Sequence, residues 1–324
     1  MRSSPFPRIP AVSNPTNQLV VSHSDTRQFV IGATCAISAV AVWAGWLVMM
    51  RLGVTTRLST TDLAALRFAV AGLVLLPIVL RRRLGIRRLG WPGFAAVVIG
   101  AGAPVPLVIG MGLAFAPAAH AGALYQGFVP FAVACLAAIV LNEPAPSIRK
   151  VGLLLIVCGA VMIGGLGVSS LIGRQNIGHI LFLSSAFMTA CYTVAIRRAG
   201  TDGLHAAAIA AVVSLLFYLP IYFVLFEDDL FTKPAADLVF QALYQGVLTG
   251  AISLALYGRA IRLLGASKAA AFVALGPTMT ALMGIPVLGE WPSSVVWAAI
   301  VIITAGVYLA SGGPLPTFRL RPLV

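Results

Sequence analysis

Residues 119–165 read AHAGALYQGFVPFAVACLAAIVLNEPAPSIRKVGLLLIVCGAVMIGG, and residues 266–312 read ASKAAAFVALGPTMTALMGIPVLGEWPSSVVWAAIVIITAGVYLASG. The two stretches match at a constant, ungapped spacing of 147 residues. In each, an apolar segment interrupted by a proline ends at Leu-x-Glu, and a second apolar segment closes on glycine. The matched positions are Ala119, Ala123, Pro130, Ala134, Val140, Leu141, Glu143, Ser147, Ile156, Gly159 and Gly165, with Ala266, Ala270, Pro277, Ala281, Val287, Leu288, Glu290, Ser294, Ile303, Gly306 and Gly312 as their counterparts. Such unbroken register indicates that the chain consists of two copies of one unit.

The composition of the chain is that of a membrane protein. Hydrophobic residues make up 60% and charged residues 10% of the 324 residues, and the mean hydropathy is +0.98. This leaves too little polar surface for a water-soluble protein. Ten apolar segments have the length needed to cross about 30 Å of hydrocarbon. These predicted spans are residues 28–50, 62–80, 91–115, 118–141, 149–167, 177–196, 204–226, 236–263, 267–288 and 293–311. We therefore expect an all-α integral membrane protein.

The spans divide the chain into four parts. Residues 1–27 are rich in Pro, Ser, Asn and Arg, and we expect a disordered tail there. The first five-helix repeat is predicted over residues 28–167, the second over 177–312, and a short second tail over 313–324. Because the first tail has no apolar core of signal-peptide type, the first helix is expected to act as its own insertion signal. The four cysteines lie singly in apolar stretches and are interpreted as core residues.

The distribution of basic residues predicts the orientation in the membrane. With ten spans both termini share a side, and that side carries 17 Lys or Arg against 4 on the other. By the positive-inside rule, both termini are predicted to be cytoplasmic in a multi-pass protein of the inner (plasma) membrane. The net charge of +13 then reflects topology and anionic lipid headgroups, so we do not expect a nucleic-acid partner.

An odd number of spans in each repeat places the second copy upside down relative to the first. Glu143 is then expected at the cytoplasmic face and Glu290 at the outer face. Inverted repeats are the construction of alternating-access carriers, which bind their substrate near the midplane between the halves. A carrier is therefore the leading functional hypothesis.

With ten apolar spans, two five-helix units and the helix endings Leu141-Asn142-Glu143 and Leu288-Gly289-Glu290, the chain resembles the EamA-type members of the drug/metabolite transporter superfamily. The resemblance covers about residues 28 to 312. Within the superfamily the chain is most similar to the YddG-type exporters of aromatic amino acids. The resemblance implies a basket in which spans 3, 4, 8 and 9 enclose a central cavity. The first copy reads Asn-Glu-Pro where Gly-Glu is usual, so Glu143 is carried over only as a structural helix-end acid.

Polar and aromatic residues within the spans are the candidate lining of that cavity. Gln245, Thr249 and Ser253 recur at i, i+4 and i+8 on one helix face, and intramembrane polar groups usually face a bundle interior or a water-filled path. Hydrogen bonding between packed helices is the alternative explanation of this stripe. For the aromatic residues, the alternatives are core packing and interfacial belts. The expected substrate-binding residues are Trp43, Trp46, His120, Tyr125, Gln126, Tyr192, Tyr244, Gln245, Ser253, Tyr257 and Phe272.

Ionisable residues within the spans are few. Arg67 is expected to pair with Asp62 or to extend toward the surface, and His120 stands at the start of a span. No Asp or Glu lies mid-membrane, so we expect facilitated movement rather than an evident proton or sodium relay. Pro130 and Pro277 are predicted to break their helices at symmetry-related depths and to serve as points of flexing.

A cavity walled by aromatic rings with a few amides and hydroxyls suits a flat, mostly apolar solute with a polar end. We therefore predict an exporter of aromatic amino acids that is not an enzyme, uses no cofactor or metal, and is compatible with a monomer. Other metabolites, nucleosides and cationic drugs fit the same description. A membrane enzyme is the rival class, but the histidines are scattered and no hydrolase elbow or phosphate-binding loop is present. An assembly protein would have no internal cavity.

Overall fold

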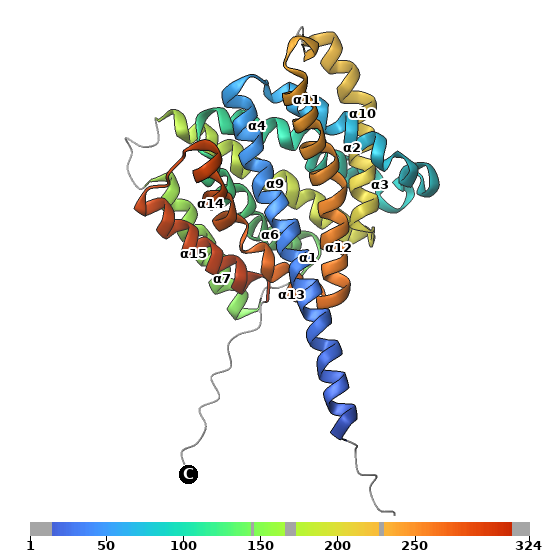
Figure 1. Cartoon of the computed structure of the whole chain (residues 1–324), viewed down its shortest axis with the longest axis vertical. Helices are drawn as coiled ribbons and strands as arrows, with labels where there is room; N and C mark the ends of the chain where they lie inside the picture. The colour runs from blue at the N-terminus through green and yellow to red at the C-terminus, as the bar shows by residue number, and fades with distance from the viewer. Residues whose placement is uncertain (1–14, 144–145, 166–172, 227–229, 313–324) are drawn as a thin grey trace, which may run out of the picture.

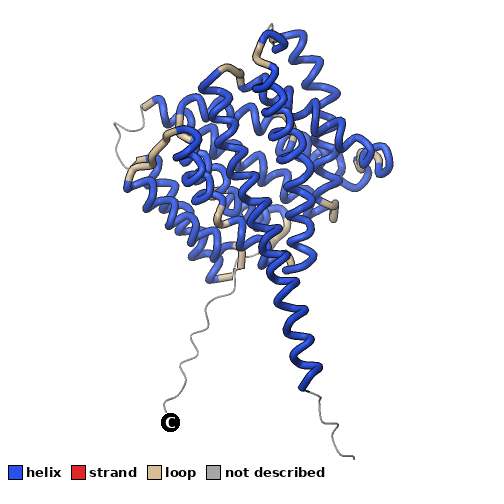
Figure 2. Tube along the Cα trace, in the orientation of Figure 1, coloured by secondary structure: helices blue, strands red, loops and turns tan. Residues whose placement is uncertain are grey.

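The computed structural model describes residues 15–143, 146–165, 173–226 and 230–312, which are helical with short connections and contain no strand (Figures 1 and 2). Nine of the ten predicted spans are helices long and apolar enough to cross a membrane. The tenth, Ser294–Ala310, is an apolar helix of 17 residues. The predicted all-α fold of two five-helix repeats is confirmed. Residues 1–14 of the first predicted tail and the whole of the second, residues 313–324, lie outside these ranges.

The first repeat comprises five spans, and the second repeats their order. Spans 1 to 5 are α1 (Pro15–Thr56), α2 (Thr60–Arg82), α3 with α4 (Ile86–Ala101, Pro104–Phe115), α5 with η1 and α6 (Ala118–Ala121, Gly122–Gln126, Val129–Val140), and α7 (Ser147–Gly164). Spans 6 to 10 are α9 (Arg174–Ala199), α10 (Gly203–Leu225), α11 with η3 and α12 (Ala235–Ala242, Leu243–Ile252, Ser253–Leu264), α13 with α14 (Ala266–Val273, Gly276–Leu288), and α15 (Ser294–Ala310). A short turn, η2 (Leu230–Thr232), precedes α11.

The first helix differs from its prediction. It begins at Pro15 and not near residue 28, so residues 15–27 are helical where the sequence predicted a disordered tail. Proline is favoured in the first turn of a helix, and no Pro or Gly follows before Gly32 to interrupt the helix. Helix propagation from the apolar segment therefore extends it, and Figure 1 shows this part of α1 projecting beyond the bundle.

The helices pack in a pattern with two-fold symmetry. Helix α7 lies along α15 and α2 lies along α10, so equivalent spans of the two repeats meet. Helix α1 packs on α12 and α14, and its counterpart α9 packs on α3, α4 and α6. Both fourth spans end in a left-handed residue, since Asn142 has φ 52° and its counterpart Gly289 has φ 67°. Asn is among the few non-glycine residues that adopt this conformation readily, so the Asn-Glu ending keeps the usual helix stop.

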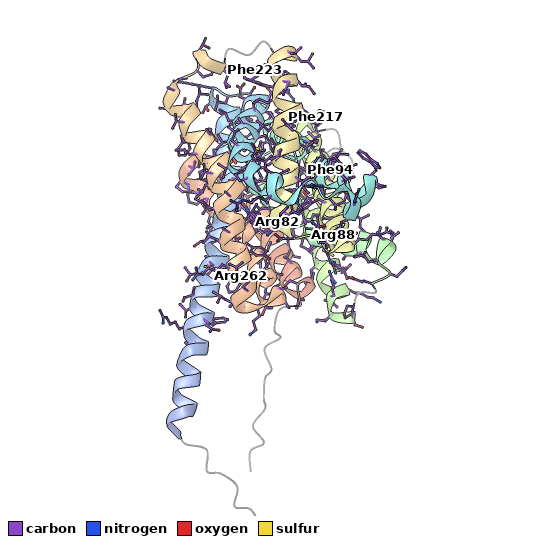
Figure 3. All side chains as sticks on the ribbon, turned by 90° about the vertical axis from the view of Figure 1, so that its right-hand side faces the viewer. Arg82, Arg88, Phe94, Phe217, Phe223 and Arg262 are labelled. Carbon is purple, nitrogen blue, oxygen red and sulfur yellow. The ribbon has the colours of Figure 1, made fainter. Side chains whose placement is uncertain are left out.

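The bundle has an apolar outer surface. Large hydrophobic side chains of α10 point outward, including Phe217 and Phe223 at 67% and 56% exposure. Figure 3 shows both on the outside of the bundle, with Arg82, Arg88 and Arg262 nearer the end from which α1 projects. An apolar belt with charges toward one end is the surface expected of a multi-pass membrane protein.

The α7–α15 contact depends on glycines, which generates a test of the fold. A Cβ at Gly306 would lie 2.7 Å from the backbone oxygen of Gly152, whereas a Cβ at Gly284, a buried glycine of α14, would meet nothing within 4 Å. We expect Gly306→Ala to destabilise the protein by about 1–3 kcal/mol through overpacking. Gly284→Ala should leave stability unchanged or raise it. Thermal melting of the detergent-solubilised protein checks this, and equal melting temperatures for the two variants would contradict the packing.

Candidate functional site

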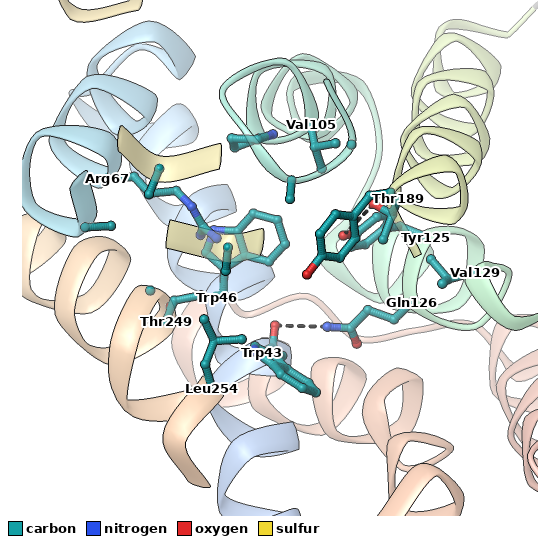
Figure 4. A pocket seen from close by; sticks show the side chains of 18 of the residues that line it. Trp43, Trp46, Arg67, Val105, Tyr125, Gln126, Val129, Thr189, Thr249 and Leu254 are labelled. Carbon is teal, nitrogen blue, oxygen red and sulfur yellow. Dashed lines mark hydrogen bonds between the residues drawn. The ribbon is translucent and has the colours of Figure 1, made fainter. Parts of the chain in front are cut away.

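A cavity of about 300 Å³ lies between the two repeats (Figure 4). Eight spans contribute to its wall, and the two that do not are α7 and α15. The wall is mostly apolar, with five aromatic rings and a few polar groups. The lining residues are Val40, Trp43, Trp46, Arg67, Phe68, Ala71, Leu75, Gly100, Ala101, Val105, Pro106, Tyr125, Gln126, Val129, Thr189, Tyr192, Ala207, Ala211, Thr249, Gly250, Leu254, Val273 and Gly276.

Irregular backbone surrounds this cavity. Spans 3, 4, 8 and 9, which the family resemblance singles out, are the interrupted ones. Span 3 breaks between α3 and α4, span 4 passes through the π-turn η1, span 8 passes through η3, and span 9 breaks before Gly276. Each break brings residues such as Gly100, Gln126, Thr249 and Gly276 to the wall. Non-helical backbone at membrane depth is tolerated where it is buried in protein or lines a cavity.

Five of the predicted substrate-binding residues line the cavity: Trp43, Trp46, Tyr125, Gln126 and Tyr192. The Trp46 and Tyr125 rings meet edge to face with centroids 6.1 Å apart. The Gln126 amide nitrogen donates to the Trp43 carbonyl at 2.9 Å, which ties η1 to α1. These contacts join span 1 to span 4 on one side of the cavity, where flat rings offer stacking surfaces.

The predicted polar stripe of span 8 does not face the cavity as a whole. Thr249 lines it, but Gln245 and Ser253 are fully buried against other helices. Gln245 donates to the Gln241 side chain at 3.2 Å, and Ser253 accepts from Trp43 Nε1 at 3.0 Å. Residues 243–252 form a π-helix with i to i+5 bonding, so the i, i+4 spacing assumed for an α-helix does not hold. Ser253 therefore takes part in hydrogen bonding between packed helices, whereas the Gln245 bond lies within span 8.

The other predicted residues that lie off the cavity have local partners. Tyr257 packs against Trp43 with ring centroids 5.1 Å apart, behind the wall, and Phe272 packs against the small buried cluster around Ala269. The Tyr244 hydroxyl donates to the Val42 carbonyl at 3.4 Å. His120 is buried in α5, and its Nδ1 lies 2.9 Å from Nε2 of His179. These four side chains do not contribute to the lining.

Arg67 lines the cavity, and its environment differs from the predicted one. It does not pair with Asp62, because Asp62 bonds its helix cap and the Tyr222 hydroxyl at 2.5 Å. The Ser59 side chain accepts from the Asp62 N–H, and the Asp62 carboxylate accepts from the Ser59 N–H. This Ser-x-x-Asp spacing is a variant of the capping box and was the signal in the sequence that Asp62 was already engaged. Thr189, which lies 3.3 Å from the Tyr125 hydroxyl, is a second lining residue that was not expected.

The two repeat-related acids form ion pairs at opposite ends of the bundle. Glu290 lies 2.7 Å from Arg51 and also accepts from the Ala118 N–H at 2.9 Å, while Arg51 donates to the Leu113 carbonyl. Glu143 lies 2.7 Å from Arg197. The side chains of the first pair are 18% and 19% exposed and those of the second 41% and 47%. Each pair joins the fourth span of one repeat to the first span of the other.

Pro130 and Pro277 stand where the structure interrupts spans 4 and 9. Pro130 is in the first turn of α6, directly after η1, and Pro277 is in the first turn of α14, directly after the break that follows Val273. The two prolines thus follow interruptions at repeat-related positions, 147 residues apart. Within the described ranges, no three His, Cys, Asp or Glu side chains gather as a metal site would require.

The fold and the cavity define an integral membrane transporter built from two five-helix repeats. The EamA-like transporter family matches this chain twice, over residues 30–165 and 176–312. The chain belongs to the EamA-like transporter family. A solved crystal structure of a protein is similar with a TM-score of 0.59 and 19% sequence identity, covering 86% of this chain and 95% of the other. At that identity the likeness shows the fold alone. No curated protein matches the chain.

The contrast between neighbouring residues of α12 provides a test of the cavity. Leu254 lines it, whereas Ser253 is fully buried against Trp43. In a variant without the native cysteines, we expect Leu254→Cys to react with a small hydrophilic methanethiosulfonate. Ser253→Cys, the matched control, should stay unreacted in the folded protein. Labelling measured by mass spectrometry checks the expectation, and equal modification of both positions would mean that the cavity is wrongly placed.

Proposed function

We propose that this transporter moves small, largely neutral aromatic metabolites, with aromatic amino acids as the substrate class, outward across the inner membrane by alternating access. The observation that carries the proposal is the cavity between the two repeats, walled by Trp43, Trp46, Phe68, Tyr125 and Tyr192. Its volume of about 300 Å³ is at the lower end of the roughly 300–1,000 Å³ of small-molecule sites. A small solute with one ring fits that size.

The polar groups of the wall suit a solute with a hydrogen-bonding end. Gln126, Thr189 and Thr249 offer amide and hydroxyl groups on two sides of the cavity. Stacked aromatic pairs contribute about 0.5–1.5 kcal/mol beyond area burial, so binding is expected to be weak. Weak binding suits a carrier that must release its solute on the far side. An organic cation is the weaker candidate, because Arg67 on the wall would repel it.

The proposed orientation in the membrane rests on the charge distribution. The side of the membrane assigned to both termini carries 17 Lys or Arg against 4 on the other. Arg82, Arg88 and Arg262 lie toward the end from which α1 projects, in keeping with that assignment (Figure 3). With this end in the cytoplasm, the Glu143–Arg197 pair is cytoplasmic and the Arg51–Glu290 pair is external.

Transport in proteoliposomes tests the substrate class. We expect labelled phenylalanine or tryptophan to enter faster than alanine or glutamate. Tyr192→Leu should weaken binding by about 2- to 13-fold, since it removes one aromatic contact worth about 0.5–1.5 kcal/mol. Phe217→Leu is the matched control, because Phe217 is 67% exposed on the outer surface. Equal rates for alanine and phenylalanine would remove the aromatic substrate from the proposal.

The two repeat-related ion pairs support alternating access. Trp46 lies five residues before Arg51 and Tyr192 lies five residues before Arg197, so the cavity is separated from each pair by about 7.5 Å of helix. Each pair links the two repeats at one face, so opening a face requires its pair to separate. The external pair is the less exposed and has two further backbone contacts. The conformation described here is therefore interpreted as closed to the outside.

The prolines supply a place for each half to bend. Pro130 and Pro277 lack a backbone N–H and follow the irregular segments that line the cavity. The helix-end acids stand thirteen residues beyond them, at Glu143 and Glu290. Bending at each proline would move its acid relative to the arginine of the other repeat. In this mechanism Glu143 and Glu290 hold the closed faces, and the prolines are the pivots.

The proposed roles of Glu143 and Glu290 in holding the two faces closed predict that their substitutions have opposite effects on access to the cavity from outside. Glu290→Gln should weaken the external closure and raise labelling of Leu254→Cys by an impermeant thiol reagent added outside cells, by several-fold. Glu143→Gln, the matched control at the other face, should lower that labelling because it favours the inward-open state. Where Glu290→Gln impairs expression, the double variant Arg51→Gln/Glu290→Gln removes the pair without leaving a lone charge. The same direction of change for both acids would contradict their roles as opposing gates.

A further inference from the structure

Arg67 places a positive charge on the wall of the cavity, within the membrane-spanning part of α2. Its guanidinium carbon lies 4.8 Å from the centroid of the Trp46 ring and 5.8 Å from that of Phe68. Figure 4 shows Arg67 beside Trp46, across the cavity from Tyr125 and Thr189. Ring faces attract a cation but accept no conventional hydrogen bond. Nη1 of Arg67 is accordingly buried without a hydrogen-bond partner.

The carboxylates whose side chains the structure describes are engaged away from the cavity. Asp62 accepts from Ser59 and Tyr222 at its helix cap. The other four form ion pairs, which are Glu143 with Arg197, Glu290 with Arg51, Asp202 with Arg82, and Asp237 with Arg57. In the described part of the chain, no ion pair reaches Arg67. The guanidinium of Arg67 can therefore pair with a negatively charged group of a solute that enters the cavity.

None of the described groups around Arg67 carries a negative charge. Trp46 Nε1, like Arg67 Nη1, is buried without a partner, and an indole N–H can only donate. The remaining polar side chains of the wall are the amide of Gln126 and the hydroxyls of Tyr125, Thr189 and Thr249. On the Arg67 side, the cavity thus lacks a hydrogen-bond acceptor with negative charge. No described carboxylate lines the cavity, so none is placed to bind an ammonium group.

A buried donor without a hydrogen-bond partner, such as Arg67 Nη1, is costly, and the planar guanidinium fits a carboxylate with two parallel hydrogen bonds. We infer that Arg67 binds the carboxylate of the transported solute. The substrate class is then aromatic carboxylates, in which an amino group beside the carboxylate contributes little to binding. This inference rests on the proposed function and modifies it in one respect. The polar end of the solute is a carboxylate bound by one named residue, so aromatic acids without an amino group, which are anions, join the neutral aromatic amino acids in the substrate class.

Three analogues that differ only in their polar end test the inference. They are phenylalanine, 3-phenylpropionate without the amino group, and 2-phenylethylamine without the carboxylate. Binding of each to the purified full-length protein is measured by calorimetry. We expect 3-phenylpropionate to bind as well as phenylalanine. Phenylethylamine should bind at least about tenfold more weakly, because it cannot form the charged hydrogen bonds with Arg67.

Variants of Arg67 separate a binding role from a structural one. Arg67→Gln should weaken 3-phenylpropionate binding by about tenfold or more and leave phenylethylamine binding unchanged or improved, which general loss of structure would not do. Arg67→Lys should restore part of the carboxylate binding. Arg82→Gln on the same helix is the matched control, because its side chain is 57% exposed. Where Arg67→Gln does not fold, the Lys variant and the analogue series on the parent protein decide.

Each contrary result has a distinct meaning. Equal binding of phenylethylamine and 3-phenylpropionate by the parent protein would overturn the role of Arg67 and leave the aromatic carrier standing. Tight binding of phenyl phosphate with no binding of either carboxylate would overturn the carboxylate assignment in favour of a phosphate ester. Absence of binding by every aromatic compound would overturn the proposed function and this inference with it.

Discussion

The bilayer core contains no water to satisfy backbone N–H and C=O groups, and the architecture follows from that constraint. Six spans meet it as single helices, whereas spans 3, 4, 8 and 9 do not. Their irregular segments face inward to the cavity, where side chains and neighbouring helices surround the freed groups. The Ser214 hydroxyl of α10, for example, accepts from the Ala103 N–H at the break between α3 and α4. The breaks in the helices and the cavity therefore occur together, because a cavity is a place where irregular backbone is tolerated at membrane depth.

Equivalent spans of the two repeats occupy equivalent places relative to the cavity. Spans 5 and 10 pack against each other through glycines and line no part of the cavity. The remaining eight spans surround it in two sets of four. Close packing resists deformation, because an interior without voids has few alternative arrangements. The α7–α15 pair therefore provides a rigid element beside which the more irregular spans 4 and 9 can rearrange.

Most of the fold could be predicted from the sequence, because a spacing of 147 residues and long apolar runs are properties of the linear chain. Most of the aromatic wall was predicted as well, since Trp43, Trp46, Tyr125 and Tyr192 lie on inward faces of spans whose helical period is regular or only briefly broken. Gln245 and Ser253 were misplaced because a π-helix changes the angular spacing between residues, and nothing in the local sequence announces it. The environment of Arg67 depends on Trp46 and Phe68 as well as on the engagement of Asp62, and sequence spacing alone does not place those rings.

The unpaired charge of Arg67 also has an electrical consequence. Moving one elementary charge across a membrane potential changes its free energy by about 2.3 kcal/mol per 100 mV. In the proposed alternating-access cycle, the position of this charge within the membrane field changes when the empty carrier switches the side to which its cavity opens. A bound monocarboxylate neutralises the site, so the field acts on the empty carrier and hardly on the loaded one. The proposed transport of such an anion carries current, and in the proposed orientation a potential that is negative inside draws the empty site back toward the cytoplasm.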